Sequence, residues 1–226
     1  MITNDNLSYA YGGGSSTLSW SHVLASLGVN GLILVTSGGC ELGGEQDPEE
    51  TNSITFNGIA MHKIADANRT EDGMSLYYLY GSEIPVAGTY TVTITYKGNG
   101  TPNYSEGVCS SWKGARNQAY EALASNTWQD ANGGNINSSI TTVSPDSLFY
   151  GCWKERTDVD YTQTTTHPVL IVLRNGSESR MMIVYDTVRV PAPTNYQINP
   201  VNPETNMMIV ASFAPQPSSN LLGADI

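Results

Sequence analysis

The chain is poor in charged residues, and positive charge is the scarcest. Only 14% of the 226 residues are Asp, Glu, Lys or Arg, against about 25% in an ordinary globular protein. The 10 basic residues are scattered, and 21 acidic residues bring the net charge to −11. A nucleic-acid-binding protein needs a positive face to displace phosphate counterions, and binding to an anionic membrane needs the same. We therefore expect neither nucleic acid nor membrane as a partner.

Long apolar runs are also missing. The longest lie at 32–35, 169–173, 181–185 and 207–211. All are of strand length, whereas a membrane-spanning helix needs about 20 apolar residues. The N-terminus, Met1-Ile-Thr-Asn-Asp, lacks the basic and then apolar pattern of a secretory signal. The sequence therefore predicts no transmembrane segment and no signal peptide.

Cysteine is limited to Cys40, Cys109 and Cys152. An odd number cannot all pair within the chain, and the spacing matches no metal motif. Three free, mostly buried thiols are the expectation, and one disulfide is the alternative. Together with the missing signal, this predicts synthesis in a reducing cytoplasm and release inside a particle by lysis.

Helical periodicity is nearly absent. The one candidate, 115–124, is rich in Ala, Leu, Gln and Glu, and it is either a short helix or a loop. Strand patterns between turn residues predict strands near 5–10, 16–24, 31–36, 53–57, 59–65, 74–80, 88–97, 106–113, 138–143, 147–153, 167–174, 180–190 and 206–213.

Turn residues and burial patterns refine this prediction. Asn57-Gly58 turns the chain, and Asn175-Gly176 predicts a two-residue hairpin, because Asn and Gly tolerate positive φ. The apolar runs 32–35 and 169–173 predict strands that are central and buried on both faces, or that lie at the sandwich core. The alternation over 89–96 predicts a half-buried strand with one wet face.

Many short strands with one short helix at most predict an all-β fold, a two-sheet jelly-roll-like β-sandwich. No internal repeat or linker is evident in the sequence. We therefore expect a single domain over 1–213, followed by a C-terminal arm or tail over 214–226.

A series of short motifs runs through most of the chain. In order they are Ser19-Trp-Ser-His22, Asn30-Gly-Leu-Ile-Leu-Val35, Ile54-Thr-Phe-Asn-Gly-Ile-Ala60, Leu76-Tyr-Tyr-Leu79, Pro85-Val-Ala-Gly-Thr-Tyr-Thr-Val92, Val108-Cys-Ser-Ser-Trp-Lys-Gly114, Ser138-Ser-Ile-Thr141 and Met207-Met-Ile-Val-Ala-Ser-Phe-Ala-Pro215. This series resembles a jelly-roll module of phage virion proteins and of bacterial surface or secreted proteins. The resemblance implies a scaffold and supplies no catalytic motif.

Catalytic and metal motifs are not visible. There is no G-x-S-x-G elbow, and His22, His62 and His167 lack zinc spacing. We expect His22 to be packed and hydrogen-bonded, with a Ser-His-Asp triad as the alternative. The acidic loop 41–50 is expected to be solvated, with a calcium-like cation site as the alternative. No catalytic residue, metal site or cofactor is predicted.

Aromatic residues give the strongest indication of binding. Trp112, Trp128, Trp153 and Tyr161 are candidates for a ligand site or an interface. Carbohydrate sites combine aromatic faces with polar donors, and Trp128 is followed by Gln, Asp and Asn. Packing in the core or between subunits is the alternative.

These observations predict a non-enzymatic virion structural protein: a capsid decoration, head-fibre or tail-associated subunit at the virion surface. Its partners would be copies of itself, as a trimer or another homo-oligomer, and other virion proteins. A carbohydrate-binding or adhesin module that recognises surface glycans is the first alternative. A glycan-degrading enzyme is the second.

Overall fold

The structure is a computed structural model, which describes residues 1–25, 27–40, 50–69, 72–97, 101–128, 136–155, 167–175, 179–198 and 206–217. The side chains of Arg69, Thr127 and Trp128 are outside the description. Within these ranges the chain forms 16 strands and two 3-10 turns, η1 (Gly28–Asn30) and η2 (Gly81–Glu83). The predicted all-β class is confirmed. No helix in the described ranges is long and apolar enough to cross a membrane.

The first half of the chain folds into two facing sheets. Its strands are β1 (Thr3–Gly12), β2 (Thr17–Leu24), β3 (Gly31–Cys40), β4 (Thr51–Phe56), β5 (Ile59–Ala60), β6 (His62–Arg69), β7 (Asp72–Tyr80), β8 (Gly88–Tyr96) and β9 (Tyr104–Lys113). One sheet has the order β1-β9-β3-β7-β6 and the other has the order β2-β8-β4-β5. The chain crosses repeatedly between the two sheets, and the resulting strand order is that of a jelly roll.

The second half repeats this arrangement. Its strands are β10 (Ala122–Trp128), β11 (Ile136–Thr141), β12 (Ser147–Glu155), β13 (Val169–Asn175), β14 (Ser179–Val188), β15 (Pro193–Ile198) and β16 (Asn206–Phe213). The sheet orders are β10-β16-β12-β14-β13 and β11-β15. Each strand occupies the place of one in the first half: β10 that of β1, β11 of β2, β12 of β3, β13 of β6, β14 of β7, β15 of β8 and β16 of β9. The described residues include no counterpart of β4 and β5.

The strand register supports the internal repeat. Equivalent cross-strand pairs are Leu32–Trp112 with Leu148–Phe213, and Leu34–Tyr78 with Tyr150–Tyr185. The repeat conserves the places of large apolar side chains far more than their identities. This is why the sequence showed no repeat.

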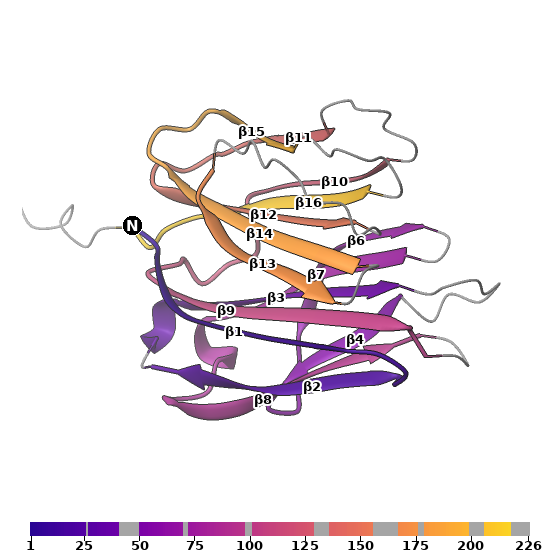
Figure 1. Cartoon of the computed structure of the whole chain (residues 1–226). Coiled ribbons are helices and arrows are strands. Elements are labelled where there is room, and N and C mark those ends of the chain that lie inside the picture. Colours follow the sequence, from indigo (N-terminus) through magenta and orange to yellow (C-terminus); the bar gives the residue numbers. More distant parts are fainter. Residues whose placement is uncertain are drawn as a thin grey trace, which may run out of the picture.

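The two jelly rolls pack through their five-stranded sheets, so that four sheets stack in layers (Figure 1). The middle core, between these two sheets, contains Leu34, Trp112, Tyr150, Ile183 and Ile209. Two outer cores lie between each five-stranded sheet and its smaller sheet. The sandwich prediction is thus confirmed, with four sheets in place of two, because each half closes its own jelly roll.

Stacking explains the burial of the apolar runs. Strand β3 is central in its sheet and covered on both faces, and all ten residues are buried, as predicted from 32–35. For 169–173 the central-strand alternative is wrong, whereas the sandwich-core alternative agrees with Leu173 in the middle core and with Leu170 and Ile171 packed against it. Strand β13 is an edge strand, and Val169 and Val172 are exposed by 40% and 43%. The sequence does not encode which apolar strand lies at an edge.

The turn predicted at Asn57-Gly58 and the alternation predicted for 89–96 both lie within the described residues, and both are confirmed. Asn57 and Gly58 have φ of 53° and 77° and join β4 to β5 as a two-residue hairpin. Strand β8 alternates between buried and less buried positions, as expected. The turn after Asn175 is outside the described residues, although β13 and β14 are antiparallel neighbours.

The region 115–124 is a loop that runs into a strand, so the helical alternative is wrong. Ala115 pairs with Pro215 in an isolated bridge, and β10 begins at Ala122. Strands β10 and β15 were not predicted from the sequence. The run 115–124, which leads into β10, is rich in helix-favouring residues, and the pairing of β10 with β16 overrides that local preference.

The residues after β16 begin as a paired segment. The Arg116 amide donates to the Ala214 carbonyl at 2.8 Å, and the Gln216 amide donates to the Gly114 carbonyl at 2.8 Å. Residues 218–226 of the predicted tail are outside the described ranges. A single domain over 1–213 with a separate tail therefore stays a prediction.

Candidate interaction surface

Four valines occupy the tips of equivalent loops at one end of the two jelly rolls. Val29 and Val86 lie in the β2–β3 and β7–β8 connections, and Val143 and Val190 lie in the β11–β12 and β14–β15 connections. Their exposed fractions are 71%, 82%, 65% and 72%. The N-terminus lies at this same end (Figure 1). A lone exposed valine is ordinary, but these four stand at equivalent positions of the repeat, and the end of the molecule that carries them is here called the valine end.

A shallow cleft of about 210 Å³ opens beside two of these tips. Leu27, Val29, Ile84, Pro85 and Val86 supply its apolar lining. The two 3-10 turns form its walls, and each turn begins with a glycine at positive φ, 64° at Gly28 and 58° at Gly81. The turn geometry therefore holds this apolar cleft open at the end of the first jelly roll.

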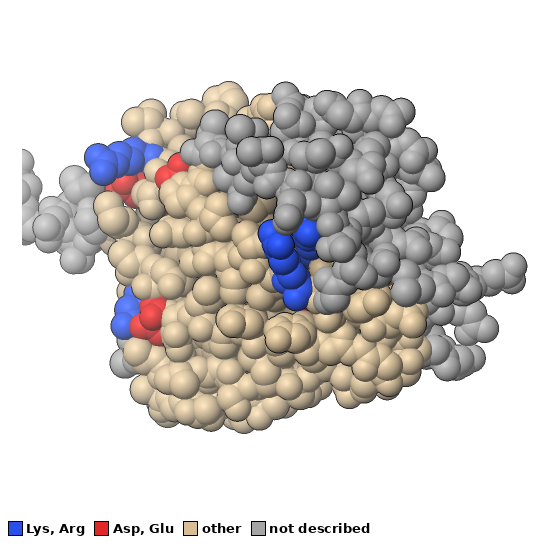
Figure 2. All heavy atoms as spheres, in the orientation of Figure 1, with Lys and Arg blue, Asp and Glu red and all other residues tan. Residues whose placement is uncertain are grey.

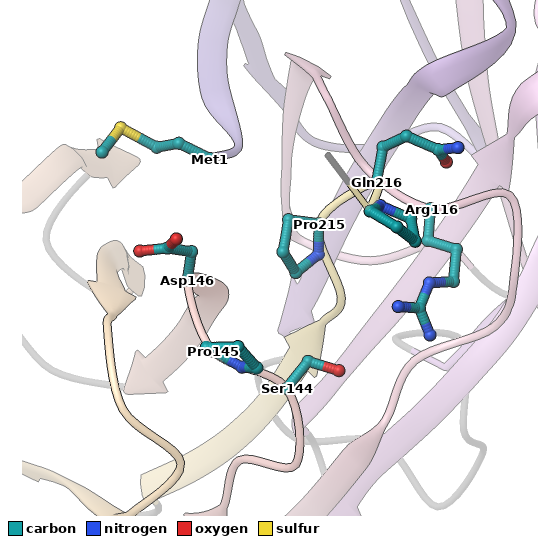
Figure 3. A pocket seen from close by; sticks show the side chains of 8 residues that line it. Met1, Arg116, Ser144, Pro145, Asp146, Pro215 and Gln216 are labelled. Atoms are coloured by element: carbon teal, nitrogen blue, oxygen red, sulfur yellow. The ribbon is translucent and has the colours of Figure 1, made fainter. Parts of the chain in front are cut away.

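A second cleft, of about 310 Å³, lies where the two halves of the chain meet. Met1 and Asp146 stand on one side, and Pro215, Gln216 and Arg116 lie on the other (Figure 3). Glu121 accepts hydrogen bonds from the hydroxyls of Ser144 and Ser147, the latter at 2.8 Å. These hydrogen bonds hold the β11–β12 loop, which forms the floor of the second cleft and carries Val143 at its tip.

The face formed by β1, β9, β13 and β14 carries little charge. Figure 2 shows one group of basic side chains near its middle, and pairs of basic and acidic side chains at its left edge. Tyr9 and Tyr11 on β1 are 52% and 60% exposed, and both point to the same side of the strand. They are the most exposed aromatic rings among the described residues.

His22 is part of a hydrogen-bonded chain that fixes its protonation. The Trp20 indole donates to the Ser8 hydroxyl at 2.9 Å, and Ser8 donates to His22 Nδ1 at 2.7 Å, because the proton of the neutral ring is on Nε2. His22 Nε2–H then donates to Ser111 Oγ at 3.2 Å, and Ser111 donates to Asp5 Oδ2 at 3.2 Å.

This chain of hydrogen bonds lies inside the first jelly roll. His22 is fully buried, and burial lowers its pKa to about 4, with Asp5 opposing the shift. The prediction of a packed, hydrogen-bonded histidine is confirmed. The Ser8 hydroxyl also accepts from Trp20, so one of its lone pairs is occupied, and neither cleft includes Ser8 or His22.

Two of the four predicted aromatic candidates are core residues. Trp112 is 1% exposed, meets Tyr150 edge-on at 6.2 Å and donates to Ser110 at 2.9 Å. Trp153 is 2% exposed and donates to Asn206 at 3.0 Å. Their burial agrees with the packing alternative, because neither ring faces solvent. The side chain of Trp128 and the whole of Tyr161 are outside the described residues.

The other two histidines and the described acidic residues do not gather at a common site. His62 pairs with Glu83 at 2.6 Å, and His167 pairs with Asp186 at 3.1 Å, on different halves of the molecule. Glu50 forms an ion pair with Lys97, while 41–49 of the acidic loop are outside the description. Among the described residues no three His, Cys, Asp or Glu side chains converge as metal ligands. The cation-site alternative for the loop therefore stays open.

Cys40, Cys109 and Cys152 are buried thiols that form no disulfide, as expected. Burial raises the pKa of the Cys109 and Cys152 thiols, the latter to about 12. Both thiols are therefore unreactive in the folded protein.

The valine end was not predicted from the sequence. A signal was present, because each valine lies among turn residues: Gly28-Val-Asn30, Pro85-Val-Ala87, Thr142-Val-Ser144 and Arg189-Val-Pro191. No protein-family model matches the chain, and no curated protein matches it significantly. The resemblance to virion and surface modules therefore depends on the sequence motifs and stays a prediction.

Proposed function

We propose that this protein is a non-enzymatic structural subunit of a virion, a decoration, head-fibre or tail-associated protein that assembles through its valine end. The observation that carries this proposal is the set of four exposed valine tips beside two clefts. Its partners are further copies of the chain and other virion proteins, and its place is the virion surface.

The energetics support docking through this end. Full burial of a valine side chain contributes roughly 1.5 kcal/mol or more, so four tips offer about 6 kcal/mol. A stable interface usually buries about 1,200–2,000 Å² in total, which is more than four side chains supply. The clefts and their proline rims would provide the remaining area.

The test combines assembly in solution with particle association. Val29→Asp with Val86→Asp, and separately Val143→Asp with Val190→Asp, place charges at the tips of one jelly roll at a time. We expect both pairs to lower the mass measured by light scattering after size-exclusion chromatography, and to abolish co-sedimentation with particles. Thr91→Asp, on the exposed face of β8, is the matched control. A wild-type monomer that is absent from purified particles would overturn the proposal.

A carbohydrate-binding or adhesin role is the second candidate, and Tyr9 and Tyr11 favour it. Two neighbouring exposed tyrosines on a face of low charge suit the apolar faces of sugar rings. A glycan array probed with the wild type and with Tyr9→Ala/Tyr11→Ala tests it. Binding that the double substitution removes supports this role, and a wild type without signal above background refutes it.

A further inference from the structure

Three charged side chains are buried where the two jelly rolls meet. Asp72 on β7, Glu106 on β9 and Lys154 on β12 each have an exposed fraction of 0%. Lys154 Nζ lies 2.8 Å from Asp72 Oδ1, and this pair joins the first jelly roll to the second. Buried charges are costly, and a natural protein seldom places three together in a core without a use for them.

The lysine is held in place by the shape of the facing sheet. Gly38 on β3 leaves the space that Lys154 fills, because a Cβ there would lie 2.9 Å from Lys154 Cδ and 2.7 Å from Met181. Glu106 is the partner of Gly38 on one side of β3, and Asp72 pairs with Cys40 on the other. Lys154 therefore reaches into a gap between two carboxyl groups and cannot swing to solvent.

The two carboxyl groups share one cation. Both Glu106 oxygens and Asp72 Oδ2 have no hydrogen-bond partner within the described ranges. Burial raises the pKa of Glu106 to about 7 and Asp72 adds to the rise, while Lys154 opposes it. A fraction of the Glu106 carboxyl groups therefore holds a proton at neutral pH, beside the ammonium–carboxylate pair formed by Lys154 and Asp72.

We propose that Lys154 and Asp72 condense to an amide that links β7 covalently to β12. The Lys154 ammonium first passes a proton to the Asp72 carboxylate, and the neutral amine attacks Asp72 Cγ. The Nζ–Cγ bond forms, one Cγ–Oδ bond breaks, and the oxygen leaves as one water molecule with two protons from the ammonium. Glu106 gives a proton to the departing oxygen and regains one from the nitrogen, so it ends as it began and no co-reactant is consumed.

The site favours this product over the ion pair. A buried ion pair keeps the desolvation cost of two charges, and the amide removes both charges at once. The reacting groups are already in contact, so little orientational entropy remains to be lost. The reverse reaction requires water in a site that excludes it, so the amide would persist once formed.

The intact mass of the purified wild-type protein tests the proposal directly. We expect a mass one water molecule below that of the sequence, and a tryptic digest in which peptide 70–97 is joined to peptide 117–156, because trypsin does not cleave after an acylated lysine. Lys154→Arg should have the full mass and yield separate peptides. Glu106→Gln should also have the full mass while its circular dichroism matches the wild type, and Glu106→Asp should restore part of the loss.

Ring closure at Asp72-Gly73 would also lose one water, and the arginine variant separates the two reactions. A deficit that persists in Lys154→Arg assigns the loss to that ring and overturns the proposal. A wild type of full mass, with Asp72 and Lys154 in separate peptides after long incubation, overturns it too. These wild-type results decide the matter even if the variants fail to fold.

Discussion

The buried histidine of the first jelly roll should make the protein sensitive to mild acid. His22 accepts a hydrogen bond from Ser8 at Nδ1. Protonation of that nitrogen would make it a hydrogen-bond donor that faces the Ser8 hydroxyl donor inside the core. The folded pKa is about 4 against an ordinary 6.5, so between these values the unfolded chain binds more protons than the folded one. Stability is therefore complete above the ordinary pKa and is lost as the pH falls toward the folded one.

The magnitude follows from the difference between the two pKa values. A difference of 2.5, from 6.5 to about 4, corresponds to about 3 kcal/mol of unfolding free energy at 1.36 kcal/mol per unit. About 2 kcal/mol of this should be lost between about pH 7.5 and about pH 5. His22→Asn supplies an amide oxygen that can accept from Ser8 and has no proton to gain, so its stability should lack this component.

Urea unfolding at the two pH values, for the wild type and His22→Asn, measures the effect. Subtracting the variant removes the contributions of other groups, including Glu106, whose raised pKa works in the opposite direction over the same interval. The two proteins should lose unequal free energies, with the wild type losing about 2 kcal/mol more. Equal losses would refute the reasoning, because they would place the acid sensitivity elsewhere.

Three further predictions test the core. Gly107→Ala should destabilise the protein by about 1–3 kcal/mol in urea, because a Cβ would lie 2.5 Å from the Trp20 ring; an unchanged midpoint would contradict the packing. A thiol reagent should label none of the three cysteines in the native protein and all three after unfolding; labelling of the folded state would show that the core opens. If the amide closes the loop between residues 72 and 154, Lys154→Arg should lower the unfolding free energy by about 4–5 kcal/mol through loop-closure entropy alone, whereas a small change would show that no covalent link constrains the unfolded chain.

Local chemistry made much of the fold predictable. Alternation identified β8, an apolar run identified β3, and Asn57-Gly58 specified its hairpin, because each signal depends only on neighbouring residues. The edge position of β13 could not be predicted in this way. The sequence of an apolar strand has the same pattern whether the strand lies in the middle of a sheet or at its edge. Only its pairing with more distant strands distinguishes these two positions.

For the candidate sites, too, local sequence was not enough. Trp112 and Trp153 were suggested as binding residues because large aromatic rings serve in cores and in ligand sites alike. Their burial depends on the sheet that covers them, and nothing within a few residues of either one encodes that. The valine end was hidden for a related reason, since its four members are spread over more than 160 residues and meet only because the strand order repeats.

The sequence by itself determined the all-β class, most strand positions, the cysteine thiols that form no disulfide and the buried histidine, because periodicity, turn residues and counts of residue types act locally. The tertiary structure decided that the chain is two jelly rolls stacked in four layers. It also decided that Asp72, Glu106 and Lys154, which are far apart in the sequence, are buried together between the two jelly rolls. Long-range packing brings such groups together and removes them from solvent, and this burial is the basis of the proposed amide bond.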